Sequence, residues 1–136
     1  MYQKIIIMGN LGADPEMRYT PSGTPVTNFS VATNRKWTNA DGTPGEETIW
    51  FRVTAWGKLG ETCNQYLSKG RQVFVEGRMN PDPETGGPRI WTGQDGVARA
   101  SFEITAFTVQ FLGGRPGAVA AGPEEQAIEE PSDIPF

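Results

Sequence analysis

Most of the apolar positions in this chain follow a strand pattern. Stretches rich in β-branched and aromatic residues alternate with Gly, Pro, Asn and Asp, which is typical of short strands joined by turns. The pattern predicts five main strands over residues 4–10, 26–37, 47–56, 72–79 and 98–112. We also expect short strands at 17–19 and 89–92, with hairpin turns at Asp41-Gly42 and Asp95-Gly96.

One segment has a helical period instead. Between residues 58 and 69, Leu59, Cys63, Tyr66 and Leu67 recur at i, i+4, i+7 and i+8 and would form one face of a helix, which Gly70 would end. Three strands, a helix and two more strands is the order of the all-β, five-stranded oligonucleotide-binding (OB) barrel, with its helix between strands 3 and 4. Another small barrel or an α+β sandwich would also fit this order.

The predicted strand 47–56 has two chemically different faces because side chains alternate along a strand. One face is apolar: Ile49, Phe51, Val53 and Ala55. The other carries Thr48, Trp50, Arg52, Thr54 and Trp56. Two tryptophans flanking an arginine suit a surface on which bases stack while a cation meets phosphate. The alternative is a second buried face, beneath the helix or another subunit.

The other tryptophans are less clearly placed by alternation. Strict alternation in strand 26–37 puts Trp37 on the face of Phe29 and Val31, so either a bulge intervenes or Trp37 belongs to the core. Trp91 lies within a long excursion over residues 80–97, where it has few core partners. A binding role is therefore favoured for Trp91.

Two of the predicted strands are apolar on both faces. Residues 5–8 read Ile-Ile-Ile-Met, and Phe74 points outward from the strand whose Val73 and Val75 point inward. Self-association would cover such a surface. Coverage of a sheet edge within the same subunit is the alternative.

Charge divides the 136-residue chain into a body and a tail. The net charge is −4, but twelve basic and eleven acidic residues up to Arg115 leave the body at +1, while five later carboxylates give the tail −5. The composition after Leu112, rich in Gly, Ala, Pro and Glu, predicts a disordered acidic tail over residues 113–136 that follows a folded domain over 1–112. An acidic tail commonly accompanies a nucleic-acid-binding body. A role in solubility alone is the alternative.

The remaining signals argue against an enzyme. The chain has no histidine, and its single cysteine, Cys63, lies on the apolar face of the predicted helix. Gly57-Lys58 is followed by Leu59, so it does not form a phosphate loop. We expect no cofactor and no metal site. Without a signal peptide or a membrane-length apolar run, the sequence predicts a soluble cytoplasmic protein, associated with the nucleoid if it binds DNA.

Several motifs together resemble the bacterial single-stranded DNA-binding proteins. They are Gly9-Asn10-Leu11-Gly12, Asp14-Pro15-Glu16, Arg18-Tyr19, Gly23, Trp56-Gly57-Lys58-Leu59, Tyr66-Leu67, Lys69-Gly70, Val73-Phe74-Val75-Glu76-Gly77 and the terminal Asp133-Ile134-Pro135-Phe136. The resemblance covers nearly the whole chain. It implies an OB fold that forms a homotetramer and binds single-stranded DNA. It also implies that the terminal peptide recruits replication, recombination and repair proteins.

The resemblance also implies which residues contact DNA. The stacking aromatics are Trp37, Trp50, Trp56 and Trp91. Trp56 stands at a position where phenylalanine is common in the family. The resemblance also favours a bulge as the explanation for the position of Trp37. The basic residues are Arg18, Arg35, Arg52, Lys58, Lys69, Arg89 and Arg99.

The chain departs from the family pattern in two places. Residues 81–88 form an insertion that leaves only Arg89 beside Trp91, and the linker before the terminal peptide is short, at about twenty residues. The first departure would weaken phosphate contact, and the second would limit the reach of the tail.

The rival hypothesis is an RNA-binding or protein-binding OB module, because the stacking face does not distinguish ribose from deoxyribose.

Overall fold

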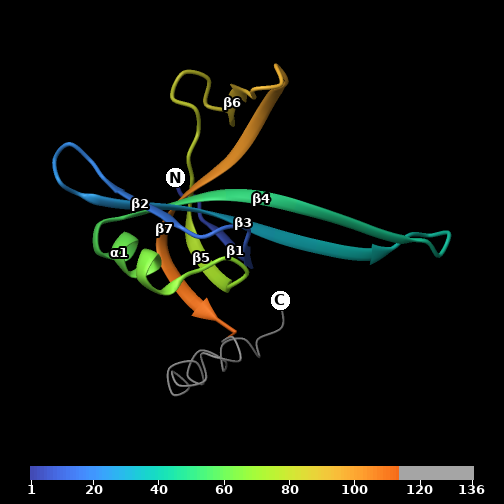
Figure 1. The fold of residues 1–136 in the computed structure, drawn as a ribbon. Coiled ribbons are helices and arrows are strands. Elements are labelled where there is room, and N and C mark those ends of the chain that lie inside the picture. The colour runs from blue at the N-terminus through green and yellow to red at the C-terminus, as the bar shows by residue number, and fades with distance from the viewer. Residues whose placement is uncertain (114–136) are drawn as a thin grey trace.

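A computed structural model describes residues 1–113 (Figure 1). Its elements in chain order are β1 (Ile5–Leu11), β2 (Glu16–Tyr19), β3 (Pro25–Thr38), β4 (Pro44–Trp56), α1 (Gly57–Tyr66), β5 (Gln72–Met79), β6 (Arg89–Thr92) and β7 (Ala98–Leu112). The predicted positions of β5, β6 and β7 match the structure, β1 is shifted by one residue, and β2, β3 and β4 extend one to three residues beyond their predicted ends.

Five of these strands close into a barrel. The hydrogen-bonded order runs β1-β5-β7-β4-β3, and β1 pairs again with β3 through Asn10 with Ala32 and Leu11 with Val31. β4 and β7 run parallel, whereas the other barrel pairs are antiparallel. The helix α1 joins the third and fourth barrel strands. The predicted five-stranded OB barrel is therefore confirmed.

Alternation along the strands fills the barrel. The core side chains without exposed surface include five from four different barrel strands: Val31, Val53, Val73, Val75 and Ile104. The predicted apolar face of β4 supplies Val53, Phe51 and Ala55 to this core. Branched aliphatic side chains suit the tapering interior of a small barrel.

The helix is shorter than its apolar period suggests. It ends at Tyr66, because Leu67 is already extended (ψ 153°) while its backbone N–H donates to Cys63. The prediction that Gly70 ends the helix is wrong, since the chain leaves the helical conformation three residues earlier. Tyr66 is also not on the buried face. It is 54% exposed, and its ring lies 5.9 Å from that of Phe111. No helix within residues 1–113 has the length and apolar run needed to cross a bilayer.

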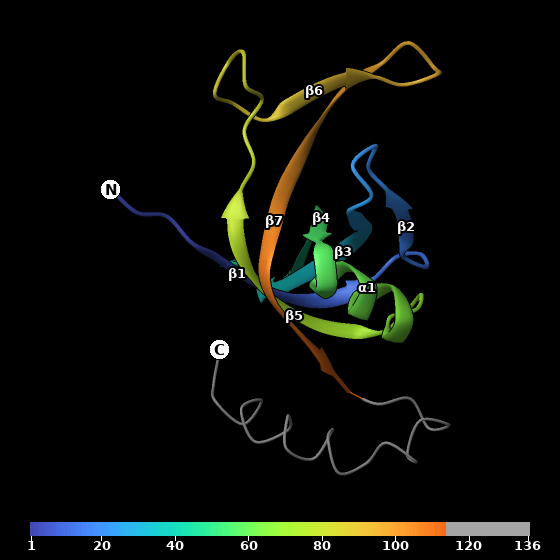
Figure 2. The ribbon, with the colours of Figure 1, turned by 90° about the vertical axis from the view of Figure 1, so that its left-hand side faces the viewer.

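Two hairpins project from the barrel. The far ends of β3 and β4 continue as a two-stranded ribbon, which we call the first arm, residues 34–48 (Figure 1). β6 pairs only with the start of β7, and the two form the second arm, residues 80–103 (Figure 2). Both predicted turns are confirmed by glycines in the left-handed region, Gly42 at φ 88° and Gly96 at φ 80°.

Candidate nucleic-acid interface

The outer side of β4 presents the predicted aromatic and basic residues to solvent. Trp50 and Trp56 are 53% and 50% exposed, and Arg52 between them is also exposed. The intervening Phe51, Val53 and Ala55 are buried. We call the exposed surface around Trp50, Arg52 and Trp56 the barrel face. The alternation prediction is confirmed, and within residues 1–113 neither the helix nor a loop buries these side chains.

The elements around β4 add further cations to this surface. Residues paired across a sheet share a face, and the pairs of Arg18 with Val26 and of Val26 with Trp56 place all three in one row. Lys58 lies two residues after Trp56, in the first turn of α1, and Lys69 follows the helix; both are exposed. None of the ion pairs found within residues 1–113 involves Arg18, Arg52, Lys58 or Lys69.

A glycine lies against the Trp50 ring. A Cβ atom placed on Gly12 would lie 2.5 Å from the ring, closer than any real side chain could approach. The backbone at Gly12 therefore lies directly against the indole. Any larger residue at position 12 would therefore displace the ring.

Trp37 occupies an environment that neither sequence interpretation anticipated. The pairing of β3 with β4 keeps one register from Val26 opposite Trp56 to Thr38 opposite Pro44, so the expected bulge is wrong. Trp37 does share a face with Phe29 and Val31, but it is not core either. The strand has left the barrel at that point, and the same face lies on the projecting first arm.

The ring of Trp37 is held by its neighbours on the first arm. It lies against Gly45, where an added Cβ would overlap the indole, and its Nε1 donates a 2.8 Å hydrogen bond to Asn39 Oδ1. The Arg35 guanidinium lies over the ring, 4.4 Å from its centroid. Arg35 also pairs with Glu47 at 3.0 Å.

The second arm repeats this combination with different elements. Trp91 is 38% exposed, and its Nε1 donates to Ser101 Oγ at 2.8 Å. The Arg99 guanidinium lies 5.8 Å from the ring centroid and pairs with Asp95 at 2.7 Å.

The expectation that only Arg89 remains beside Trp91 is therefore wrong, because Arg99 is the residue directly opposite Trp91. Arg89 instead pairs with Glu103, at 3.4 Å.

Several residues of this surface were not predicted from the sequence. Lys36 is exposed and shares the face of Ala32 and Trp50 along the β3–β4 ladder. The sequence did hold a signal for Lys36, because neighbours along a strand point to opposite faces and Lys36 precedes Trp37. Gly12 and Gly45 carried no such signal, because a glycine that supports a ring from another strand is recognisable only once the register is known.

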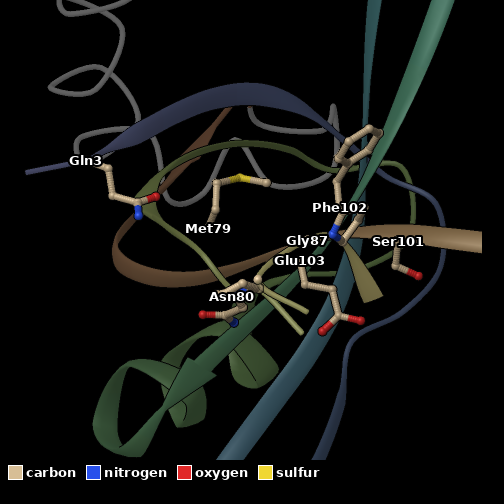
Figure 3. Close-up of a pocket in the computed structure, with 10 residues that line it drawn as sticks. Gln3, Met79, Asn80, Gly87, Ser101, Phe102 and Glu103 are labelled. Atoms are coloured by element: carbon tan, nitrogen blue, oxygen red, sulfur yellow. The ribbon is translucent and has the colours of Figure 1, made fainter. Parts of the chain in front are cut away.

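A separate hollow lies at the root of the second arm. It has a volume of about 330 Å³ and is lined by Gln3, Met79, Asn80, Pro81, Gly86, Gly87, Pro88, Ser101, Phe102 and Glu103 (Figure 3). This lining contains neither a basic residue nor a tryptophan. The hollow is thus poorly suited to a nucleic-acid backbone, in contrast to the barrel face.

Residues 1–113 offer little reactive chemistry. Cys63 is fully buried, and burial raises the pKa of its thiol to about 12, so it stays protonated at neutral pH. No group of three or more His, Cys, Asp or Glu in this part of the chain is placed to hold a metal ion. The predicted docking peptide, Asp133 to Phe136, lies outside the described residues.

Comparison with known proteins matches this architecture to one family. The model of the single-strand binding protein family matches residues 2–112. The single-stranded DNA-binding protein of Neisseria meningitidis serogroup A is 41% identical over 90% of this chain and 67% of its own length. That of Xanthomonas axonopodis pv. citri is 46% identical over 82% of this chain and 58% of its own length.

Solved structures show the same likeness. A Plasmodium falciparum SSB complex with ssDNA superposes with a TM-score of 0.67 at 25% identity, covering 83% of this chain and 97% of that chain. A deletion mutant of the Thermus aquaticus single-stranded DNA binding protein gives a TM-score of 0.62 at 28% identity, over 82% of this chain and 51% of that one. The chain therefore belongs to the single-strand binding protein family.

Proposed function

We propose that this protein binds single-stranded DNA along the barrel face and extends the contact onto both arms, and that it thereby protects single strands during replication, recombination and repair. The observation that carries the proposal is the exposed Trp50, Arg52 and Trp56 on a strand whose other face is core. Family membership supports the choice of ligand.

The chemistry of this surface favours binding without sequence preference. Each base stacked on an aromatic ring contributes roughly 1–3 kcal/mol and is tolerated whatever its identity. Arg18, Arg52, Lys58 and Lys69 are exposed cations that would meet the phosphates. Affinity should therefore fall with salt, by about 0.7 in log affinity per phosphate neutralised and per decade of salt for a single strand.

A fluorescence titration tests the proposal directly. Oligo-dT should quench the tryptophans, matched duplex should compete poorly, and added salt should reverse the quenching. The triple variant W50A/R52Q/W56A should lose most of the affinity. The matched control is Tyr66→Ala, which removes an equally exposed aromatic from the helix. Equal affinity for duplex, or an equal loss in the control, would refute the barrel face as the binding surface.

Competition with RNA separates the two OB-module hypotheses. Oligo-dT and oligo-U of one length can be titrated against the same labelled strand. Preference for DNA supports the proposal, while preference for RNA favours the rival. Absence of binding to both would favour a protein-binding module.

The terminal peptide Asp133-Ile134-Pro135-Phe136 is proposed to dock onto partner proteins. Its apolar side chains adjoin the α-carboxylate, a combination that fits a small apolar pocket beside a basic residue. The other tail carboxylates would steer the peptide toward basic partners. Deletion of Phe136 should abolish capture of repair and replication proteins and leave DNA affinity unchanged. Loss of both activities would contradict this division of roles.

Self-association as a homotetramer is proposed from the apolar outer wall of the barrel. Ile6 is 53% exposed and shares its face with Met8, whose cross-strand partner is Phe74. A second copy would remove this apolar surface from water. Size exclusion with light scattering should give four chains per particle, with and without poly-dT. Ile6→Glu should lower that mass. A monomeric wild-type protein would rule the assembly out.

A further inference from the structure

The two arms share one local arrangement, although they come from different parts of the sequence. In each arm an arginine lies over a tryptophan and at the same time pairs with a carboxylate of that arm. Arg35 lies over Trp37 and pairs with Glu47, at 4.4 and 3.0 Å. Arg99 lies over Trp91 and pairs with Asp95, at 5.8 and 2.7 Å. We call these sets the arm triads.

In an arm triad, groups of the protein already occupy the positions that a base and a phosphate would take. The guanidinium lies over the indole, on a face where a base would stack. The carboxylate takes the place of a phosphate on the guanidinium, since both are anions that accept charge-assisted hydrogen bonds from arginine. Consistent with this, both arm tryptophans are less exposed than Trp50 and Trp56. A strand that reaches an arm must therefore exchange with groups of the protein.

We propose that Glu47 and Asp95 set the affinity of the arms for single-stranded DNA by holding Arg35 and Arg99 in these internal contacts. The inference rests on the proposed DNA-binding function. The carboxylates are competitors of phosphate, and each must release its arginine before that arginine contacts the strand. Arg52, Lys58 and Lys69 of the barrel take part in none of the ion pairs within residues 1–113, so no carboxylate of this part of the chain has to release them.

This exchange has a consequence for salt dependence. A free arginine that neutralises a phosphate releases a counterion from the strand. An arginine taken from Glu47 releases the same counterion, but the freed carboxylate then attracts a cation from solution. The two effects partly cancel. Arm arginines therefore contribute less to the salt dependence of binding than barrel cations do.

The test is Glu47→Gln, which keeps the shape of the side chain and removes its charge. Exposed ion pairs are weak, so we expect the variant to bind oligo-dT about 1.4- to 5-fold more tightly. We also expect the slope of log affinity against log salt to steepen by up to about 0.7. Asp95→Asn should act likewise, and its amide oxygen still accepts the hydrogen bond from the Val97 N–H that shapes the turn.

Two controls distinguish internal competition from a general loss of negative charge. Glu46→Gln removes a neighbouring exposed carboxylate that takes part in none of the ion pairs within residues 1–113. It should raise affinity less than Glu47→Gln. In an Arg35→Gln background, Glu47→Gln should lose its advantage over Glu46→Gln, because no arginine remains to be released.

The outcomes distinguish failure of the proposal about Glu47 and Asp95 from failure of the proposed DNA-binding function. Equal gains from Glu46→Gln and Glu47→Gln, or an undiminished gain in the Arg35→Gln background, would overturn the inference, as would unchanged affinity and slope in both Glu47→Gln and Asp95→Asn. Failure of the wild-type protein to bind oligo-dT would instead overturn the proposed function. Thermal unfolding of each variant should match the wild-type protein, since the substituted groups are on the surface.

Discussion

The barrel face and the arms are built from the same residue types but present them differently. On the barrel face, Trp50 and Trp56 are half exposed, and Arg52 between them takes part in no ion pair within residues 1–113. On the arms, Trp37 and Trp91 are more covered, and Arg35 and Arg99 contact both a ring and a carboxylate. The residues that surround a tryptophan and an arginine therefore decide whether the two are already engaged in contacts within the described part of the chain.

The architecture explains the difference. β4 is a strand of a closed barrel, so its inner face is fixed by the core. On its outer face, Trp50, Arg52 and Trp56 lie opposite the short side chains of Ala32, Ser30 and Val26 on β3. An arm is a two-stranded ribbon without a core of its own. Its long polar side chains contact one another across the two strands, as Arg35 and Glu47 do from directly opposite positions.

Loss of a stacking ring should have the largest effect on affinity and should differ between the two regions. We expect Trp50→Ala to cost about 1–3 kcal/mol of binding free energy, or roughly 5- to 150-fold. Trp37→Ala should cost less, because the wild-type protein must give up a cation–π contact worth about 0.5–1 kcal/mol before a base can stack there. Equilibrium titration with oligo-dT measures both. A larger loss from Trp37→Ala would reverse the comparison.

Displacement of a ring by a methyl group should have an intermediate effect. The methyl group of Gly12→Ala would displace the Trp50 ring, and that of Gly45→Ala would displace the Trp37 ring. We expect Gly12→Ala to weaken binding by about 1 kcal/mol, roughly 5-fold, as part of the stacking contribution is lost. Gly45→Ala should weaken it less. Gly87→Ala is the control, because a Cβ there meets only Thr85 Oγ1, at 3.7 Å. Equal effects in all three variants would show that the ring positions are unimportant.

The smallest expected difference lies in the salt dependence. Arg52→Gln should reduce the slope of log affinity against log salt by about 0.7, the contribution of one phosphate contact. Arg35→Gln should reduce it by less, since Glu47 offsets part of that contribution in the wild-type protein. Titrations at four or more salt concentrations resolve the slopes. A steeper contribution from Arg35 than from Arg52 would contradict the distinction between free and paired cations.

The sequence was sufficient to predict the barrel and the two faces of β4 because both depend on alternation. The inward Phe51 and Val53 and the outward Trp50 and Arg52 follow from a period of two, and that period survives in the structure. The end of α1 could not be predicted in the same way. Burial of Leu67 in an extended conformation overrides the helical spacing that it shares with Cys63.

The environment of the arm tryptophans could not be read from the sequence, because it depends on contacts between strands. The sequence predicts a bulge before Trp37 or a place for Trp37 in the core, whereas the ribbon continues past the barrel with its register intact. The pairing of Arg99 with Asp95, rather than Arg89 alone beside Trp91, likewise requires the register of β6 on β7. Side chains that meet across strands become neighbours only once that register is fixed.

Oligonucleotide length tests the central claim, that the barrel face binds a strand before the arms do. One reporter protein keeps Trp50 and Trp56 and carries Trp37→Phe and Trp91→Phe; the other keeps only the arm tryptophans. Each is titrated with dT oligonucleotides from about 4 to 16 nucleotides, the range of sites known for OB folds. We predict that the shortest strands that bind quench the barrel reporter and leave the arm reporter unchanged, with arm quenching appearing only at greater length. Quenching of the arm reporter first, or of both reporters at every length, would contradict the account.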